Sequence, residues 1–267
     1  THRHTEYISF LKIIRNLCAL YAYVFKHRTM KKISADWVFP ISSPPIENGV
    51  VITDDAGKIL AIERREQHAP ASLEIHRGAL TPGFVNTHCH LELSHMKGKV
   101  DTGTGLIPFI TSVVTKRNVN AEIIAEAIEQ AEAEMLAGGI VALGDISNAP
   151  DTFAVKAKGR LRYYTFVELF DFLQETGAEK AFSDWKSVYE KIELAPGSAR
   201  ALVPHAPYTV SKSLFQKIND FNEKLGITVS IHNQETPPES ELFEKGSGAF
   251  YDFYGKFNIS LEQFRPT

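Results

Sequence analysis

Two histidines separated by one residue, His88 and His90, follow an apolar run that ends at Val85. In a β-strand, successive side chains alternate between the two faces, so these imidazoles would share a face about 6.6–6.8 Å apart along the chain. Two imidazoles at that spacing can bind one cation, each at about 2.0–2.1 Å. The spacing alone is weak, because a chain with ten histidines produces such pairs by chance. His2 and His4 share it at the start of the chain, where no site is expected.

Further polar residues stand where later predicted strands end. His205 lies in VPHAPYTVS, His232 lies in SIHNQET, and Glu235 follows three residues after His232. A single histidine is more often structural than a ligand, but the carboxyl ends of parallel strands meet at one edge of a sheet. Glu235 is either a solvated loop carboxylate or a proton carrier beside a metal-activated water. The combination favours a metal-dependent hydrolytic site.

The elements that must position these residues are visible in the hydrophobic pattern. Residues 31–80 are typical of short strands, with a hairpin turn at DDAG. After Leu80 the pattern changes to strands that alternate with helices, which predicts parallel βα units. The five predicted strands lie near residues 82–90, 140–146, 161–170, 200–206 and 227–233. The candidate site residues fall at their carboxyl ends, where a (β/α)₈ barrel carries its chemistry.

The composition is that of a soluble globular protein, with 43% hydrophobic and 23% charged residues in a chain of 267. A net charge of −3 gives no electrostatic reason to expect a nucleic acid or an anionic membrane as partner. Two cysteines, Cys18 and Cys89, make no disulfide framework, which suits a reducing compartment. We therefore expect a cytoplasmic protein.

The first residues stand apart from the rest. Residues 8–25 are apolar, but Lys12 and Arg15 interrupt them, so a transmembrane helix is not expected. Met30 begins a segment that resembles a natural protein start. We expect residues 1–29 to be an extension, upstream of the true start; an additional amphipathic helix is the alternative.

Three segments, PGFVNTHCHLELS, HAPYTVS and IHNQET, together resemble the amidohydrolase superfamily. They most resemble its branch of metal-dependent deaminases and chlorohydrolases, which includes guanine, S-adenosylhomocysteine and aminodeoxyfutalosine deaminases. The resemblance runs from about Lys32 to the end of the chain. It implies an α/β fold, a (β/α)₈ TIM barrel joined to a small β-sandwich. Residues 30–80 would be part of the sandwich, and residues 81–267 would be the first five βα units of the barrel.

The resemblance also implies roles for individual residues. His88 and His90 correspond to the pair of metal ligands on the first barrel strand, and His232 corresponds to the ligand on the fifth. Glu235 corresponds to the carboxylate that carries a proton from the water to the leaving side of the substrate, and His205 to the histidine that faces the substrate. The fourth strand reads ALVPHAPY without the lysine that bridges two metals in another subtype, so one Zn²⁺ or Fe²⁺ ion is expected.

The reaction that the resemblance implies is hydrolytic deamination of a purine-like nucleobase, nucleoside or related heterocycle. Removal of chloride or opening of a cyclic amide at the same site is the alternative, and a fragment without activity is the third possibility. The expected partner is a small heterocyclic substrate, with no nucleic acid and no membrane. A homo-oligomer is expected for the complete protein.

The sequence departs from the family pattern in its last part. The family places a further histidine on the sixth strand and an aspartate on the eighth, and Asp252 does not match that aspartate. The residues after Leu80 are fewer than the about 250 of a typical (β/α)₈ barrel. We therefore expect the chain to be the N-terminal part of a longer enzyme, truncated at its carboxyl end.

The roles of five more residues are less defined by the pattern. Cys89 should point away from the face that carries the two histidines and pack against helices. Glu92 shares the parity of the histidine pair, so it could line the pocket. Asp145 and Glu168 stand near the ends of the second and third strands, and pocket lining and structural hydrogen bonding are equally compatible with their positions. A substrate contact is the less favoured interpretation of His95.

Overall fold

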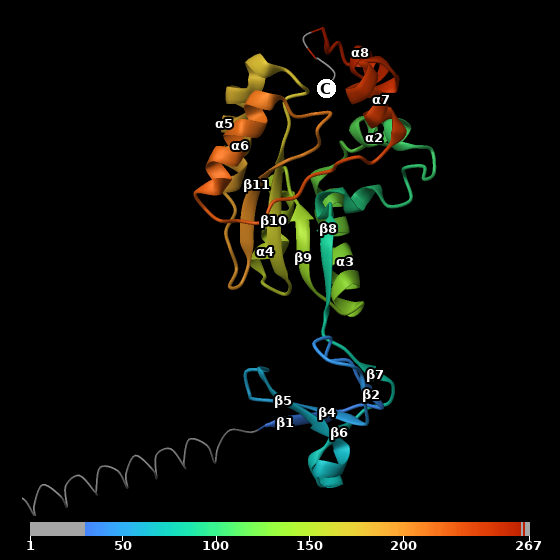
Figure 1. Ribbon diagram of the computed structural model, residues 1–267, viewed down its shortest axis with the longest axis vertical. Helices are drawn as coiled ribbons and strands as arrows, with labels where there is room; N and C mark the ends of the chain where they lie inside the picture. The colour runs from blue at the N-terminus through green and yellow to red at the C-terminus, as the bar shows by residue number, and fades with distance from the viewer. Residues whose placement is uncertain (1–29, 263, 265–267) are drawn as a thin grey trace, which may run out of the picture. The chain divides into compact units, whose positions relative to one another are not determined.

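The computed structural model describes residues 30–262 and residue 264 (Figure 1). The described part of the chain divides into two compact units, one that ends at Pro82 and one that begins at Gly83. The extension predicted at residues 1–29, which includes His2 and His4, lies outside the described residues. Within the described part of the chain, no helix combines the length and the apolar character that crossing a bilayer requires.

The first unit is built from short strands in two sheets, with the orders β5-β4-β1-β6 and β3-β2-β7. The strands are β1 (Lys31–Ser34), β2 (Trp37–Val38), β3 (Ile46–Glu47), β4 (Gly49–Thr53), β5 (Ile59–Arg64), β6 (Glu74–Ile75) and β7 (Ala79–Leu80). The predicted hairpin at DDAG is confirmed, since β4 and β5 pair antiparallel around it. Asp54 fixes this turn, because its Oδ1 accepts hydrogen bonds from the backbone N–H groups of Ala56 and Lys58 at 3.0 and 2.9 Å.

The second unit contains a parallel sheet of four strands in the order β11-β10-β9-β8. These strands are β8 (Phe84–Cys89), β9 (Ile140–Ile146), β10 (Arg162–Leu169) and β11 (Ala199–Pro204). Figure 1 shows them side by side, with helices alternating with them along the chain. The arrangement is a partial (β/α)₈ barrel, and no closed barrel forms within the described residues. The predicted fold class is confirmed.

Helices cover one face of this sheet and gather at its carboxyl end (Figure 1). They are α2 (Leu106–Lys116), α3 (Ala121–Ala137), α4 (Phe153–Ala157), α5 (Ala178–Glu190), α6 (Lys212–Glu223), α7 (Pro237–Lys245) and α8 (Ala249–Lys256). On the helix side, Val167 of β10 and Leu202 of β11 pack against Leu214 of α6 in a buried cluster. Near the carboxyl ends of the strands, Leu242 of α7 and Phe250 of α8 form a second cluster.

The prediction of a fifth strand at residues 227–233 is wrong, because this segment pairs with no strand in the described structure and β11 forms the edge of the sheet. The backbone N–H of Thr228 bonds to a side chain rather than to a neighbouring strand: it donates a hydrogen bond to the Tyr164 hydroxyl at 2.9 Å. One backbone bond joins the segment to the residues after β11, where the His232 N–H donates to the His205 carbonyl at 2.9 Å. The segment therefore still brings His232 to the carboxyl edge of the sheet.

A buried ion pair ties β9 to the helix layer, and its loss should have a large effect on stability. The Asp145 carboxylate, which is fully buried, lies 2.7 Å from the Lys156 ammonium. We expect Asp145→Ala to lower the free energy of unfolding by about 3–5 kcal/mol, because it leaves the Lys156 charge buried without a partner. Urea denaturation measures this loss. Asp101→Ala, at an exposed position, should change stability by no more than about 0.5 kcal/mol. An equal effect of the two substitutions would contradict the prediction.

Candidate functional site

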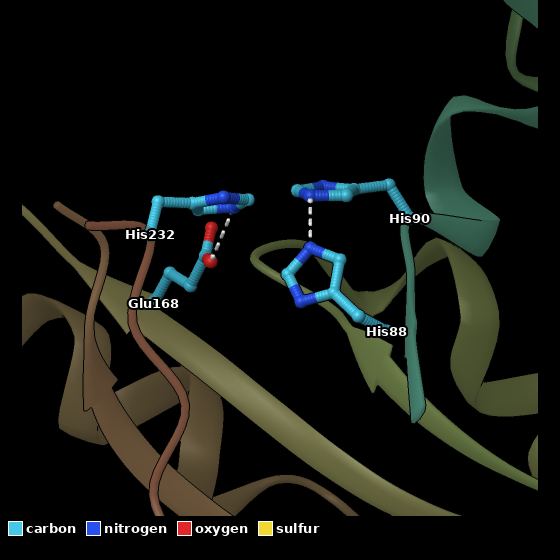
Figure 2. A group of neighbouring side chains, drawn as sticks. All are labelled: His88, His90, Glu168 and His232. Carbon is cyan, nitrogen blue, oxygen red and sulfur yellow. Dashed lines mark hydrogen bonds and ion pairs between the residues drawn. The ribbon is translucent and has the colours of Figure 1, made fainter. Parts of the chain in front are cut away.

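Four side chains converge at the carboxyl edge of the sheet: His88, His90, Glu168 and His232. One potential ligand atom from each lies within 4.8 Å of the others. Figure 2 shows the three imidazoles and the carboxylate facing a common centre. His88 Nε2 lies 3.3 Å from His90 Nε2, and His232 Nε2 lies 3.5 Å from Glu168 Oε1. The structure thus brings together all three histidines that the sequence predicts as ligands.

Strand alternation explains how β8 supplies two of these groups. His88 lies within the strand and His90 directly follows it, so both side chains reach the same face. Cys89, between them, points the other way and packs beside Leu91 and Ile128, which confirms the prediction for it. Burial raises the pKa of the Cys89 thiol, so it is inert at neutral pH.

The same alternation separates the two carboxylates that the pattern left open. Glu168 shares a face of β10 with Phe166, which packs with Ile146 on the inner side of the sheet. Asp145 points to the helix side instead, where it pairs with Lys156 and accepts from the Leu91 N–H at 2.9 Å. Glu168 therefore belongs to the site and Asp145 is structural.

The close approach of β8 and β9 next to His88 fixes the position of this residue along the sheet. A Cβ atom at Gly144 of β9 would lie 2.2 Å from the carbonyl oxygen of Thr87, the residue that precedes His88. We expect Gly144→Ala to push β8 from β9, to destabilise the fold by about 1–3 kcal/mol and to weaken metal binding. Gly255→Ala in α8 is the control, because its Cβ would meet no atom within 4 Å. Urea denaturation and Zn²⁺ titration test this, and unchanged Zn²⁺ affinity in Gly144→Ala would contradict it.

The donor set and its spacing fit a single divalent cation. In a tetrahedral site with metal–nitrogen bonds of about 2.0–2.1 Å, two ligand atoms are separated by about 3.3–3.4 Å. The 3.3 Å between His88 and His90 nitrogens matches this edge. Burial lowers the pKa of His88, and it lowers the pKa of His90 to about 4. Both rings are therefore neutral at pH 7, which is the form that binds metals.

His232 is held from both sides by carboxylates. Its Nδ1 lies 3.1 Å from Glu235 Oε1, and its Nε2 faces Glu168. The contact with Glu168 and the charges of both carboxylates raise the pKa of His232, although burial opposes this. The second Glu235 oxygen accepts from the Tyr208 hydroxyl at 3.0 Å. With Glu235 on Nδ1, the Nε2 lone pair is directed into the cluster, as in many carboxylate–histidine–metal sites.

His205 stands beside the cluster, with its ring centroid 5.3 Å from that of His232. Its Nδ1 lies 2.7 Å from the hydroxyl of Thr209, and that hydroxyl donates its only hydrogen to the Ala206 carbonyl. Nδ1 must therefore be the donor, and Nε2 is left as an acceptor. Burial lowers the pKa of His205 to about 4, so the ring is neutral at pH 7.

Glu92 and His95 have structural contacts. Glu92 is buried and accepts from the backbone N–H groups of Asn148 and Ala149 at 2.8 and 3.2 Å. Burial raises the pKa of Glu92, against the opposing charge of Arg117. His95 is buried and its Nε2 donates to the Arg117 carbonyl at 2.9 Å. Both residues hold the segment after β8 in place, and neither reaches the cluster.

The chain matches known proteins over most of its described length. The model of the Amidohydrolase family matches residues 79–256. An aminodeoxyfutalosine deaminase from a Nitratiruptor species is 30% identical over 196 residues, which cover 70% of this chain and 46% of that protein. The chain spans about half the length of the curated relatives that it matches.

Solved structures of this kind share the fold. The Helicobacter pylori aminofutalosine deaminase in complex with methylthio-coformycin has a TM-score of 0.71 at 24% identity, over 85% of this chain and 56% of that chain. An adenosine deaminase from Xanthomonas campestris with bound zinc has a TM-score of 0.59 at 22% identity, over 85% of this chain and 55% of that chain. The family match and the shared barrel confirm the resemblance: the chain belongs to the amidohydrolase family.

Proposed function

We propose that this protein is a metal-dependent hydrolase that removes the amino group from a purine-like nucleoside. The observation that carries the proposal is the convergence of His88, His90 and His232 on one centre, with Glu235 in contact with the third imidazole. The relatives support the substrate class, because several are named as deaminases of aminodeoxyfutalosine or 5′-deoxyadenosine. We place the reaction in the cytoplasm, since the cysteine content suits a reducing compartment.

In this proposal, His88, His90 and His232 hold one Zn²⁺ or Fe²⁺ ion. When bound, the ion supplies Lewis acidity that makes water nucleophilic near neutral pH. The neutral state of His88 and His90 favours its binding, and the Glu235 contact keeps the Nδ1 proton of His232 away from the cluster.

Glu235 and His205 act on the substrate. Glu235 accepts the proton of the attacking water and returns it to the departing amino group, which leaves as ammonia. Its side chain is partly exposed, so it can exchange its contact with His232 for one with water or substrate. His205 presents an unprotonated Nε2, so it accepts a hydrogen bond from an N–H or O–H of the substrate.

Ammonia release tests the proposal. The chain is loaded with Zn²⁺ or Fe²⁺ and incubated with aminodeoxyfutalosine, 5′-deoxyadenosine, S-adenosylhomocysteine and guanine. We expect metal-dependent ammonia release from at least one of the nucleosides, with loss of activity when a chelator removes the metal. A chlorotriazine is the comparison substrate. Chloride release without ammonia release from any substrate, or no turnover with either metal, would overturn the proposal.

A further inference from the structure

Glu168 is a buried carboxylate whose one ion-pair contact in the described part of the chain is with His232, at 3.5 Å. It is 1% exposed, and its Oε1 lacks a hydrogen-bond partner among the described residues. No lysine or arginine among the described residues forms an ion pair with it. A buried carboxylate requires a positive charge or several donors, because the loss of hydration is otherwise too costly. A cation bound at this oxygen would supply that positive charge.

The surroundings of Glu168 specify the kind of cation. Its Oε1 lies 3.5 Å from His232 Nε2, close to the separation of about 3.3–3.4 Å between two ligands of a tetrahedral ion. A carboxylate oxygen of Glu168 also lies within 4.8 Å of the ligand nitrogens of His88 and His90. An ion pair with a protonated His232 would satisfy only one of these three nitrogens. A divalent ion would satisfy all four groups at once.

The backbone holds Glu168 in this position. Its N–H donates to Asn148 Oδ1 at 2.8 Å, and β10 lies between β9 and β11 in the sheet. The side chain therefore projects from a central strand rather than from a loop. A rigid strand end is a better support for a ligand than a mobile loop, because less order must be gained on binding.

We propose that Glu168 is itself a ligand of the metal and completes a donor set of three imidazoles and one carboxylate. This inference rests on the metal site of the proposed function and extends it by one residue. The resemblance to the superfamily implies a carboxylate ligand on the eighth strand, whereas Glu168 supplies one from β10, the third strand of the sheet. The negative charge reduces the net charge of the buried centre, which favours retention of a divalent ion.

Metal binding to the full chain tests this inference without any assay of activity. Zn²⁺ affinity is measured by competition with a chromophoric chelator, and the visible absorption of bound Co²⁺ reports the ligand set. We expect Glu168→Gln to weaken Zn²⁺ binding by at least about 10–100-fold and to change the Co²⁺ spectrum. Without metal, Glu168→Gln should melt no lower than the wild type, because a buried charge has been removed.

Glu132→Gln is the matched control. Glu132 is also fully buried, but it accepts from the Tyr163 hydroxyl on the helix side of the sheet. Its substitution should lower the melting temperature and leave Zn²⁺ affinity and the Co²⁺ spectrum unchanged. If Glu168→Gln fails to fold, Glu168→Asp replaces it, with weaker Zn²⁺ binding expected because the shorter side chain withdraws the oxygen.

The outcomes separate this inference from the proposed function. If the Glu168 variants bind Zn²⁺ as tightly as the wild type, Glu168 is not a ligand, and the site of three histidines stands. If Glu168→Gln instead lowers the melting temperature of the metal-free protein, the residue is a structural partner of His232 and the inference is overturned. If the wild type binds neither Zn²⁺ nor Co²⁺, both the inference and the proposed function fail.

Discussion

His88→Ala will weaken Zn²⁺ binding by at least about a hundredfold and will abolish metal-dependent ammonia release. The expected loss is large because the remaining nitrogens cannot close around the ion: His88 Nε2 lies 3.3 Å from His90 Nε2 and its ring lies 4.6 Å from that of His232. Changes in groups that only support a ligand already cost about 10–100-fold in affinity, and removal of a ligand itself costs more. Chelator competition measures the affinity.

The control for this experiment is another histidine that lies outside the cluster. His76 is exposed in the first unit and contacts Glu74, so His76→Ala should bind Zn²⁺ as the wild type does. Circular dichroism establishes that both variants are folded. Equal Zn²⁺ affinity in His88→Ala and in the wild type would mean that the histidines do not form a metal centre.

The face of a strand on which a side chain lies could be predicted from the sequence where the strand carried distinctive residues such as histidines. The spacing of His88 and His90 indicated that both side chains lie on the same face of the strand. It followed that Cys89 lies on the opposite face. The structure places these two histidines beside His232. Fold class could be predicted for the same reason, because strand–helix alternation and polar strand ends are properties of local sequence.

The carboxylates could not be assigned in this way. In β10 the residues on both faces are apolar, for example Phe166 on the inner side and Val167 on the helix side. Strands of a parallel sheet are buried on both faces, so their pattern does not reveal which face meets the helices. Glu168 and Asp145 could be placed on opposite sides only when the register of β9 with β10 was known.

The error at residues 227–233 has a different origin. The segment is rich in β-branched residues, which favour a strand, but a strand also needs a neighbour with free backbone groups. In the structure, the Tyr164 hydroxyl engages the Thr228 N–H instead of a ladder. Such a contact between residues far apart in the sequence depends on tertiary structure, and local propensity does not contain it.

The largest effect on turnover alone is expected at Glu235. Glu235→Gln should lower the rate of ammonia release by about 10²–10⁴-fold, because an amide cannot accept and return a proton as a carboxylate does. Zn²⁺ affinity should change less than about tenfold, since the amide oxygen can still accept from His232 Nδ1. Steady-state kinetics on the metal-loaded protein, beside chelator competition, measure both quantities. Glu244→Gln, at an exposed position of α7, is the control.

Comparison with Glu235→Ala separates the two tasks of this carboxylate. Alanine removes both the proton carrier and the acceptor that orients His232, so it should lower Zn²⁺ affinity by about 10–100-fold in addition to the rate. Glu235→Gln should lower mainly the rate of ammonia release. If both variants lose affinity equally, Glu235 serves mainly to position His232. If Glu235→Gln retains full turnover, another group must carry the proton, and the contact with Tyr208 is then structural.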